Sequence, residues 1–145
     1  LLVGNAGILV SKVLYVKHGE NRIFVIADAA MNDLIRPTLY DAYHEIVPII
    51  PPAGDAPTEL VDVVGPVCET GDIFAEQRLM KVPQSGDLIA FRSAGAYGAV
   101  MAGTYNARPL IAEVMVRGDK FSVVRPRQTY EELLGRDKLP EWLNK

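Results

Sequence analysis

The chain has 145 residues, of which 49% are hydrophobic and 23% are charged. This length suits one domain with a sizeable core, and this composition excludes an intrinsically disordered chain. The formal net charge is only -3 and the Lys and Arg residues are scattered along the chain, which argues against nucleic-acid binding and against a polybasic membrane anchor.

The chain has a single cysteine, Cys68, so it cannot form an internal disulfide. Unpaired cysteines are typical of a reducing compartment, and we expect a cytoplasmic protein. Residues 1–10 are small and apolar, without an initiator Met or a basic region, so they do not resemble a signal peptide. They are also far shorter than the roughly 20 apolar residues of a membrane span. We therefore expect no membrane segment, and a chain that begins inside a larger protein.

A hairpin is predicted near the start of the chain. Side chains alternate over residues 10–17, a turn follows at residues 18–21, and residues 22–27 are rich in Ile, Phe and Val. Alternation followed by a turn and a second apolar run is typical of two paired strands. Residues 28–43 then break the β pattern and predict an irregular, partly helical loop.

Three further strands are predicted in the middle of the chain, at residues 45–50, 58–67 and 88–92. Proline and glycine between them indicate surface connections. Residues 73–82 have a mixed pattern with a short helical appearance.

The clearest hairpin is predicted toward the C-terminus. Residues 110–116 and 121–124 are both apolar and flank a turn that contains Gly118 and Asp119. Such a Gly-containing pair suits a two-residue hairpin loop.

The last predicted element is a helix. Thr129 and Glu132 fit a capping box, and the apolar pattern ends at Gly135, which marks the C-terminal end. With about six to eight short strands in total, this pattern favours a mainly β fold. We predict a Greek-key-like β-barrel or sandwich with short helices and a C-terminal helix.

Cys68 is the first candidate for a functional residue. It lies beside Glu69 on a stretch shaped by Gly65, Pro66 and Gly71, which predicts a loop that closes a strand. A thiol on such a loop can face a cavity. The alternative is a buried, inert cysteine, which is the more frequent case for a cysteine considered alone.

Two other stretches carry candidate side chains. Arg36 lies four residues before Tyr40, and Pro37 restricts Arg36 to extended or turn geometry. A guanidinium beside a phenol can hold a carboxylate, although a surface arginine is the more common outcome. Tyr97 lies among small residues at 93–99, where it can offer an aromatic face and a phenol to a ligand or simply pack at a tight bend.

The acidic residues and the histidine between residues 28 and 45 do not predict a metal site, because their spacing matches no metal-ligand motif. No serine lies on a nucleophile elbow, so a catalytic triad is not predicted either.

Three motifs, at residues 28–40, 64–72 and 93–98, together resemble the C-terminal β domain of diaminopimelate decarboxylases. These are pyridoxal-phosphate enzymes of lysine biosynthesis with an alanine racemase/ornithine decarboxylase-like fold. The resemblance extends from Val3 to about Glu132. Three long motifs in the right order make it specific.

The resemblance implies a two-domain enzyme, a TIM-type (β/α)₈ barrel followed by a β domain. Residues 1–10 would be the tail end of the barrel or a linking element, residues 11–135 the C-terminal β-barrel domain and residues 136–145 a C-terminal tail. In the family the barrel carries the lysine that forms a Schiff base with pyridoxal 5′-phosphate. No lysine in this chain matches that position, so we expect these 145 residues alone to be inactive.

The resemblance also implies roles for five residues. Cys68 would be the catalytic proton donor, and Arg36 would bind a substrate carboxylate with help from Tyr40. Glu69 would engage the distal amino group of the substrate, and Tyr97 would contact both cofactor and substrate. In this family the active sites are shared across a homodimer, with the Cys68 loop reaching the partner subunit's cofactor.

The implied reaction is the decarboxylation of meso-2,6-diaminopimelate, a diamino dicarboxylic acid, to L-lysine and CO₂. The residue types agree with it, since a thiol is largely protonated at neutral pH and Arg36 and Glu69 complement the charges of the substrate's distal end. Two alternatives remain open. One is a related pyridoxal-phosphate decarboxylase of another basic amino acid, and the other is a non-catalytic β module for dimerisation or regulation.

Overall fold

The computed structural model describes residues 2–51 and 54–143. The chain divides into two compact units, Leu1–Ala102 and Gly103–Lys145. This division falls inside residues 11–135, which the sequence leads us to treat as one domain. The domain boundaries expected at residues 10 and 135 stay a prediction.

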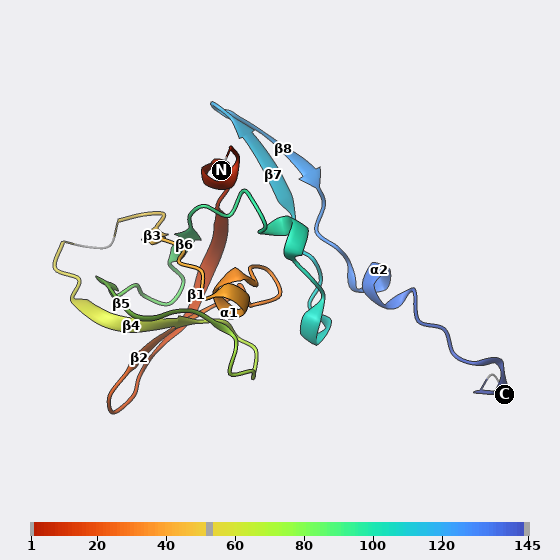
Figure 1. The fold of residues 1–145 in the computed structure, drawn as a ribbon, viewed down its shortest axis with the longest axis horizontal. Coiled ribbons are helices and arrows are strands. Elements are labelled where there is room, and N and C mark those ends of the chain that lie inside the picture. The colour runs from red at the N-terminus through yellow and green to blue at the C-terminus, as the bar shows by residue number, and fades with distance from the viewer. Residues whose placement is uncertain (1, 52–53, 144–145) are drawn as a thin grey trace. The chain divides into compact units, whose positions relative to one another are not determined.

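Six strands of the first unit form one curled sheet (Figure 1) in the spatial order β3-β6-β1-β2-β4-β5. The strands β2 and β4 are parallel, and the other neighbouring pairs in this order are antiparallel. The mainly β prediction is therefore confirmed. The strand bounds are β1 Leu9–His18, β2 Ile23–Ala27, β3 Ile46–Pro48, β4 Thr58–Val64, β5 Ile73–Lys81 and β6 Leu88–Phe91.

The long strand β1 connects the two halves of this sheet. Its first part pairs with β6, and its second part pairs with β2 after a register shift between Val13 and Tyr15. A bulge of this kind bends a strand and increases its twist, which lets one strand serve both halves. The predicted N-terminal hairpin is thus confirmed, and β1 also has a second partner far along the sequence.

The prediction of a short helical appearance for residues 73–82 is wrong, because residues 73–81 form a strand, β5, that contains a bulge. Its sequence is rich in residues that favour helices, but pairing with β4 stabilises the strand more than these local preferences stabilise a helix. The Gln77 backbone has a positive φ of 45°, next to a register shift between Val61 and Val63. The buried Asp62 carboxylate accepts a hydrogen bond from the Gln77 N–H at 2.7 Å. This bulge interrupts the alternation by which a strand is identified from sequence.

The core of the first unit lies on the inner face of the curled sheet. Val13, Val25 and Val63 come from three different strands and are fully buried. The rings of Phe74 and Phe91 lie 4.5 Å apart between centroids at an interplanar angle of 43°. Their strands, β5 and β6, are far apart in the strand order, so the sheet must curl until these side chains meet.

A buried polar network fixes the loop that follows β2. The Ser11 hydroxyl is 2% exposed and donates to Asp28 at 2.7 Å. The same hydroxyl accepts from the Ala29 N–H at 3.0 Å. The buried Asp33 carboxylate accepts from the Ala30 N–H at 2.9 Å. Because buried polar groups need such partners, this network sets the path of the loop toward the short helix α1, Arg36–Tyr40.

The second unit contains the strands β7, Glu113–Arg117, and β8, Lys120–Arg125, which form a hairpin. Gly118 lies in its turn with a φ of 61°, so the predicted hairpin is confirmed. The helix α2, Tyr130–Leu134, follows, and both hydrogen bonds of the predicted capping box are present. Short 3₁₀ segments occur at Gly4–Ala6, Ala99–Met101, Tyr105–Ala107 and Glu141–Leu143.

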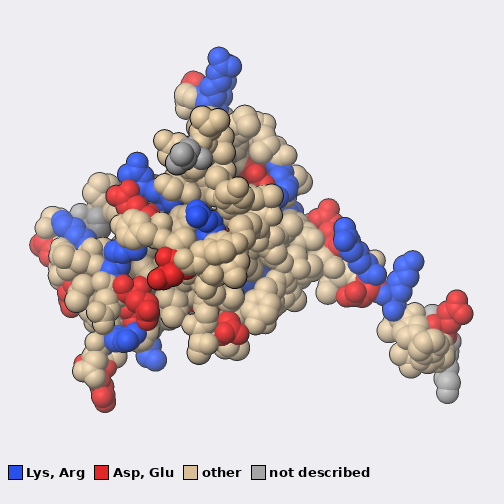
Figure 2. Space-filling model, viewed as in Figure 1, with Lys and Arg blue, Asp and Glu red and all other residues tan. Residues whose placement is uncertain are grey.

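Charged side chains do not gather into one patch on the face drawn in Figure 2, where Lys and Arg are interspersed with Asp and Glu. Within residues 2–51 and 54–143, no helix is both long and apolar enough to cross a membrane.

Candidate functional site

Cys68 lies on the loop between β4 and β5. The two strands pair as far as Val64 and Ile73, and the Gly65 N–H donates to the Asp72 carbonyl at 2.9 Å, so the loop is closed at its base. The Cys68 thiol is free and exposed. Within the described part of the chain Cys68 is therefore not packed in the core, while its proposed role stays a prediction.

The Asp72 side chain supports this loop from inside. It is 2% exposed, and its Oδ2 accepts a hydrogen bond from the Val67 N–H at 2.8 Å. A Cβ on residue 65 would overlap the Asp72 carboxylate, so glycine permits this close approach. Sequence reasoning did not single out Asp72. The available signal was an Asp at the end of a loop, a position from which such side chains often accept backbone hydrogen bonds.

The Cys68 loop is joined to the segment that carries Arg36. The Met31 N–H donates to Asp72 Oδ1 at 2.7 Å, and the Thr38 hydroxyl donates to the Gly71 carbonyl at 2.5 Å. A Cβ on residue 71 would lie 2.9 Å from the Thr38 methyl group, so Gly71 permits this close approach. Two segments that are more than 30 residues apart in the sequence are therefore held side by side.

Arg36 and Tyr40 are the two ends of helix α1. Residues four apart lie on the same side of a helix, and Tyr40 is 60% exposed. The helix stops at Asp41, whose backbone adopts a left-handed conformation and donates to the Arg36 carbonyl. The predicted partly helical loop is confirmed, while the ligands of Arg36 and Tyr40 stay a prediction.

Glu69 is exposed next to Cys68, and its Oε1 accepts from the Gly71 N–H at 3.2 Å. The carboxylate of Glu69 therefore shares the surface of the loop with the Cys68 thiol.

Tyr97 lies on a different loop, residues 93–98, after β6. Its side chain is 63% exposed and its φ is 59°. The loop is fixed to the N-terminal segment, since the Ala94 N–H donates to Gly7 at 2.9 Å and the Gly95 N–H donates to Gly4 at 3.0 Å. Within the described part of the chain Tyr97 is therefore exposed and not part of the core, while its proposed role stays a prediction.

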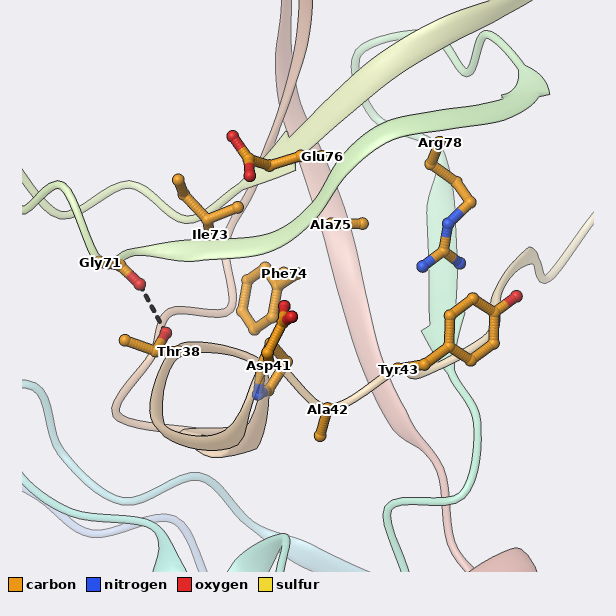
Figure 3. Close-up of a pocket in the computed structure, with 11 residues that line it drawn as sticks. Thr38, Asp41, Ala42, Tyr43, Gly71, Ile73, Phe74, Ala75, Glu76 and Arg78 are labelled. Carbon is orange, nitrogen blue, oxygen red and sulfur yellow. Dashed lines mark hydrogen bonds between the residues drawn. The ribbon is translucent and has the colours of Figure 1, made fainter.

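A cavity of about 380 Å³ lies between helix α1 and strand β5 (Figure 3), next to the hydrogen bond from Thr38 to Gly71. Thr38 and Gly71 line one end of it. At the other end, the Arg78 guanidinium lies 4.2 Å from the centre of the Tyr43 ring. None of the five predicted site residues lines this cavity. In the part of the chain that the structure describes, no three His, Cys, Asp or Glu side chains are grouped as a metal ion would require.

Residues 2–95 match the family model described as "Pyridoxal-dependent decarboxylase, C-terminal sheet domain". The chain is 56% identical to the diaminopimelate decarboxylase of Zymomonas mobilis, covering 98% of this chain and 33% of that protein. It is 51% identical to the enzyme of that name from Vibrio cholerae, covering 97% and 33% respectively. The crystal structure of diaminopimelate decarboxylase from Helicobacter pylori complexed with L-lysine superposes with a TM-score of 0.85 at 42% identity, covering 93% of this chain and 32% of that one. The chain thus spans about a third of the length of the relatives it matches.

Proposed function

The chain belongs to the pyridoxal-dependent decarboxylases, as their C-terminal sheet domain, and on this premise we propose that the whole protein converts meso-2,6-diaminopimelate to L-lysine and CO₂. In this proposal the reaction is the last step of lysine biosynthesis. The protein would act in the cytoplasm as a homodimer, together with an N-terminal barrel domain that carries the Schiff-base lysine.

The observation that carries the proposal is the direct connection between the Cys68 loop and the segment that contains helix α1, which we call the joint. Hydrogen bonds from Met31 to Asp72 and from Thr38 to Gly71 hold the two segments together. The thiol remains exposed at the surface of this joint. A rigid β scaffold that presents polar loop residues in this way is a typical setting for a site.

The donor set fits a pyridoxal group with an amino-acid substrate. The exposed phenol of Tyr97 provides an aromatic face and a hydroxyl that suit a planar cofactor and its substrate. Pyridoxal 5′-phosphate, when bound, supplies the electron sink that decarboxylation of an amino acid requires. The tasks left to this chain are to orient the substrate and to deliver a proton.

Orientation falls to charged side chains at the distal end of the substrate. That end carries one carboxylate and one ammonium group. Arg36 would hold the carboxylate through its planar guanidinium, with the Tyr40 phenol beside it. Glu69 would hold the ammonium group. A substrate that lacks the distal carboxylate leaves Arg36 without a partner, which strengthens discrimination against it.

Proton delivery falls to Cys68. When the C–C bond breaks and CO₂ leaves, the bonding electron pair stays on the substrate carbon, and that carbon must gain a proton. The S–H group of Cys68 would donate it. In the proposed homodimer the Cys68 loop reaches the partner subunit's site.

The proposal is tested by a substrate panel with the full-length protein and pyridoxal 5′-phosphate. CO₂ release is measured from meso-2,6-diaminopimelate, L-lysine, L-ornithine and L-arginine. We expect turnover only of meso-2,6-diaminopimelate. Replacing Arg36 with Ala should lower the preference for this substrate, expressed as a ratio of kcat/KM values, about 100-fold or more. The absorbance of the bound cofactor should be unchanged. Preference for L-ornithine or L-arginine would favour a related decarboxylase of another basic amino acid. No turnover of any substrate would favour a non-catalytic module.

A further inference from the structure

His44 has a hydrogen bond that none of the proposed roles uses. Its imidazole is 1% exposed, and its Nδ1 lies 2.8 Å from the Arg92 carbonyl oxygen. A carbonyl oxygen only accepts, so Nδ1 carries the proton and donates. The other ring nitrogen, Nε2, is buried without a hydrogen-bond partner among the described residues. Within that part of the chain, the bond to Arg92 is therefore the only one that the ring makes.

Arg92 is the residue immediately before the Tyr97 loop, residues 93–98. Its N–H donates to the Glu45 carbonyl at 2.8 Å, which extends the pairing of β3 with β6 by one step. Its side chain forms an exposed ion pair with Glu45 at 2.9 Å. The His44 ring thus binds the last carbonyl of this paired segment, immediately before the chain turns into residues 93–98.

The loop needs such a support because its backbone is strained. Ser93 and Tyr97 have φ values of 60° and 59°, in the left-handed region that residues with a side chain occupy only when their surroundings hold them there. The bonds from Ala94 and Gly95 to the N-terminal segment hold the middle of the loop. The bond from His44 holds its start.

We infer that His44 is a positioning residue, whose Nδ1–H···O=C bond to Arg92 fixes the direction in which the loop presents Tyr97. The His44 carbonyl itself accepts from the Arg78 guanidinium at 3.1 Å, so the segment that carries the ring is attached to β5 as well. The effect of His44 on the reaction rests on the proposed function of Tyr97. Its effect on the loop does not.

Two variants of the full-length protein distinguish the effect of losing the hydrogen-bond donor from the effect of losing the volume of the ring. His44→Asn keeps an N–H donor near the position of Nδ1, and His44→Leu keeps volume without a donor. The chain has one other histidine, His18, which is exposed at the end of β1, and His18→Leu is the matched control. Should His44→Leu fail to fold, His44→Gln replaces it, because its longer side chain places the amide beyond the Nδ1 position.

The first measurement is amide hydrogen exchange of residues 92–98. We expect His44→Leu to speed exchange in this segment by roughly tenfold or more, as local opening becomes easier, with the rest of the sheet unchanged. His44→Asn and His18→Leu should match the unmodified protein. Unchanged exchange in residues 92–98, or an equal increase across the whole sheet, overturns the inference.

The second measurement is a double-mutant cycle with Tyr97→Ala, read as kcat/KM and as pyridoxal phosphate affinity. We expect His44→Leu to lower kcat/KM by about 10- to 100-fold, because small misplacements of a site residue have effects of this size, and to have almost no further effect once Tyr97 is Ala. An equal loss in both backgrounds overturns the inference. If loop exchange rises in His44→Leu while Tyr97→Ala alone changes neither quantity, the positioning of the loop stands and the proposed function of Tyr97 fails.

Discussion

At the scale of single residues, the decisive feature is an exposed thiol on a loop held by a buried carboxylate. Cys68 is exposed, so replacing it removes no contact in the core of this unit, and an effect on turnover can be separated from an effect on the folding of the unit.

We expect Cys68→Ala in the full-length protein to lower kcat about 10²- to 10⁴-fold, the usual contribution of a general acid. The melting temperature and the bound-cofactor absorbance should not change. Gln84→Ala, an exposed position outside this loop, is the control and should keep near-normal turnover. Near-normal turnover in Cys68→Ala itself would remove the thiol from the mechanism.

A second residue-scale prediction concerns Gly65. A Cβ here overlaps the Asp72 carboxylate, which cannot move without losing its bonds to Val67 and Met31. We expect Gly65→Ala to lower the free energy of unfolding by about 1–3 kcal/mol, as other overpacked sites do. Denaturant unfolding measures this loss. Gly54→Ala, with no atom near the new Cβ, should be nearly neutral, and equal losses in the two variants would exclude the overlap as the cause.

At the scale of elements, the sequence predicts strands well where alternation and turn residues agree. Both predicted hairpins and the capping box of Thr129 are present. The prediction fails at β5, where helix-favouring residues and the bulge at Gln77 obscure a strand that long-range pairing creates.

The candidate site likewise contains parts that the local sequence predicts and parts that depend on long-range contacts. Local composition identifies the Cys68 loop and the loops of Arg36 and Tyr97, because glycine, proline and isolated functional side chains are visible in the sequence. The joint between the Cys68 loop and α1 depends on Asp72 and Thr38, whose partners lie more than 30 residues away. No local pattern specifies these bonds, so they could not be predicted.

Helix α2 should be sensitive to acid. The pKa of Glu131 is lowered from 4.5 by a hydrogen bond from its own backbone N–H and by another from the Thr129 side chain. The lowered pKa in the folded helix means that the unfolded segment binds more protons as the pH falls. The stabilisation of the helix by the ionised Glu131 is therefore present above pH 4.5 and is lost progressively as the pH falls through the lowered pKa of the folded state. Amide exchange of residues 131–134, corrected for intrinsic rates, should lose protection on acidification in the unmodified protein and less so in Glu131→Gln. An identical pH dependence in both would show that other carboxylates control this helix.

At the scale of the whole molecule, this chain spans only about a third of the length of its relatives. Arg36 is half-buried at the start of helix α1, and Cys68 and Tyr97 are exposed on two loops of the same unit. These three groups alone do not enclose a substrate. A complete site therefore needs surfaces from elsewhere, and the proposed sources are the barrel domain and a second subunit. Which subunit supplies Cys68 to a given site can be determined by mixing inactive variants.

The mixing experiment combines full-length Cys68→Ala with full-length Tyr97→Ala, each nearly inactive alone. If Cys68 serves the partner subunit's site while Tyr97 serves its own, a mixed dimer contains one site with both groups intact and one with neither. Random reassortment makes half of the dimers mixed, so about a quarter of the wild-type activity should return, as expected for a symmetric dimer with shared sites. The rate of CO₂ release after dissociation and reassociation of an equimolar mixture measures this recovery. If Cys68 and Tyr97 of each site came from the same subunit, every site in the mixture would lack one group and no activity would return. That result would exclude the arrangement in which the two groups of one site come from different subunits.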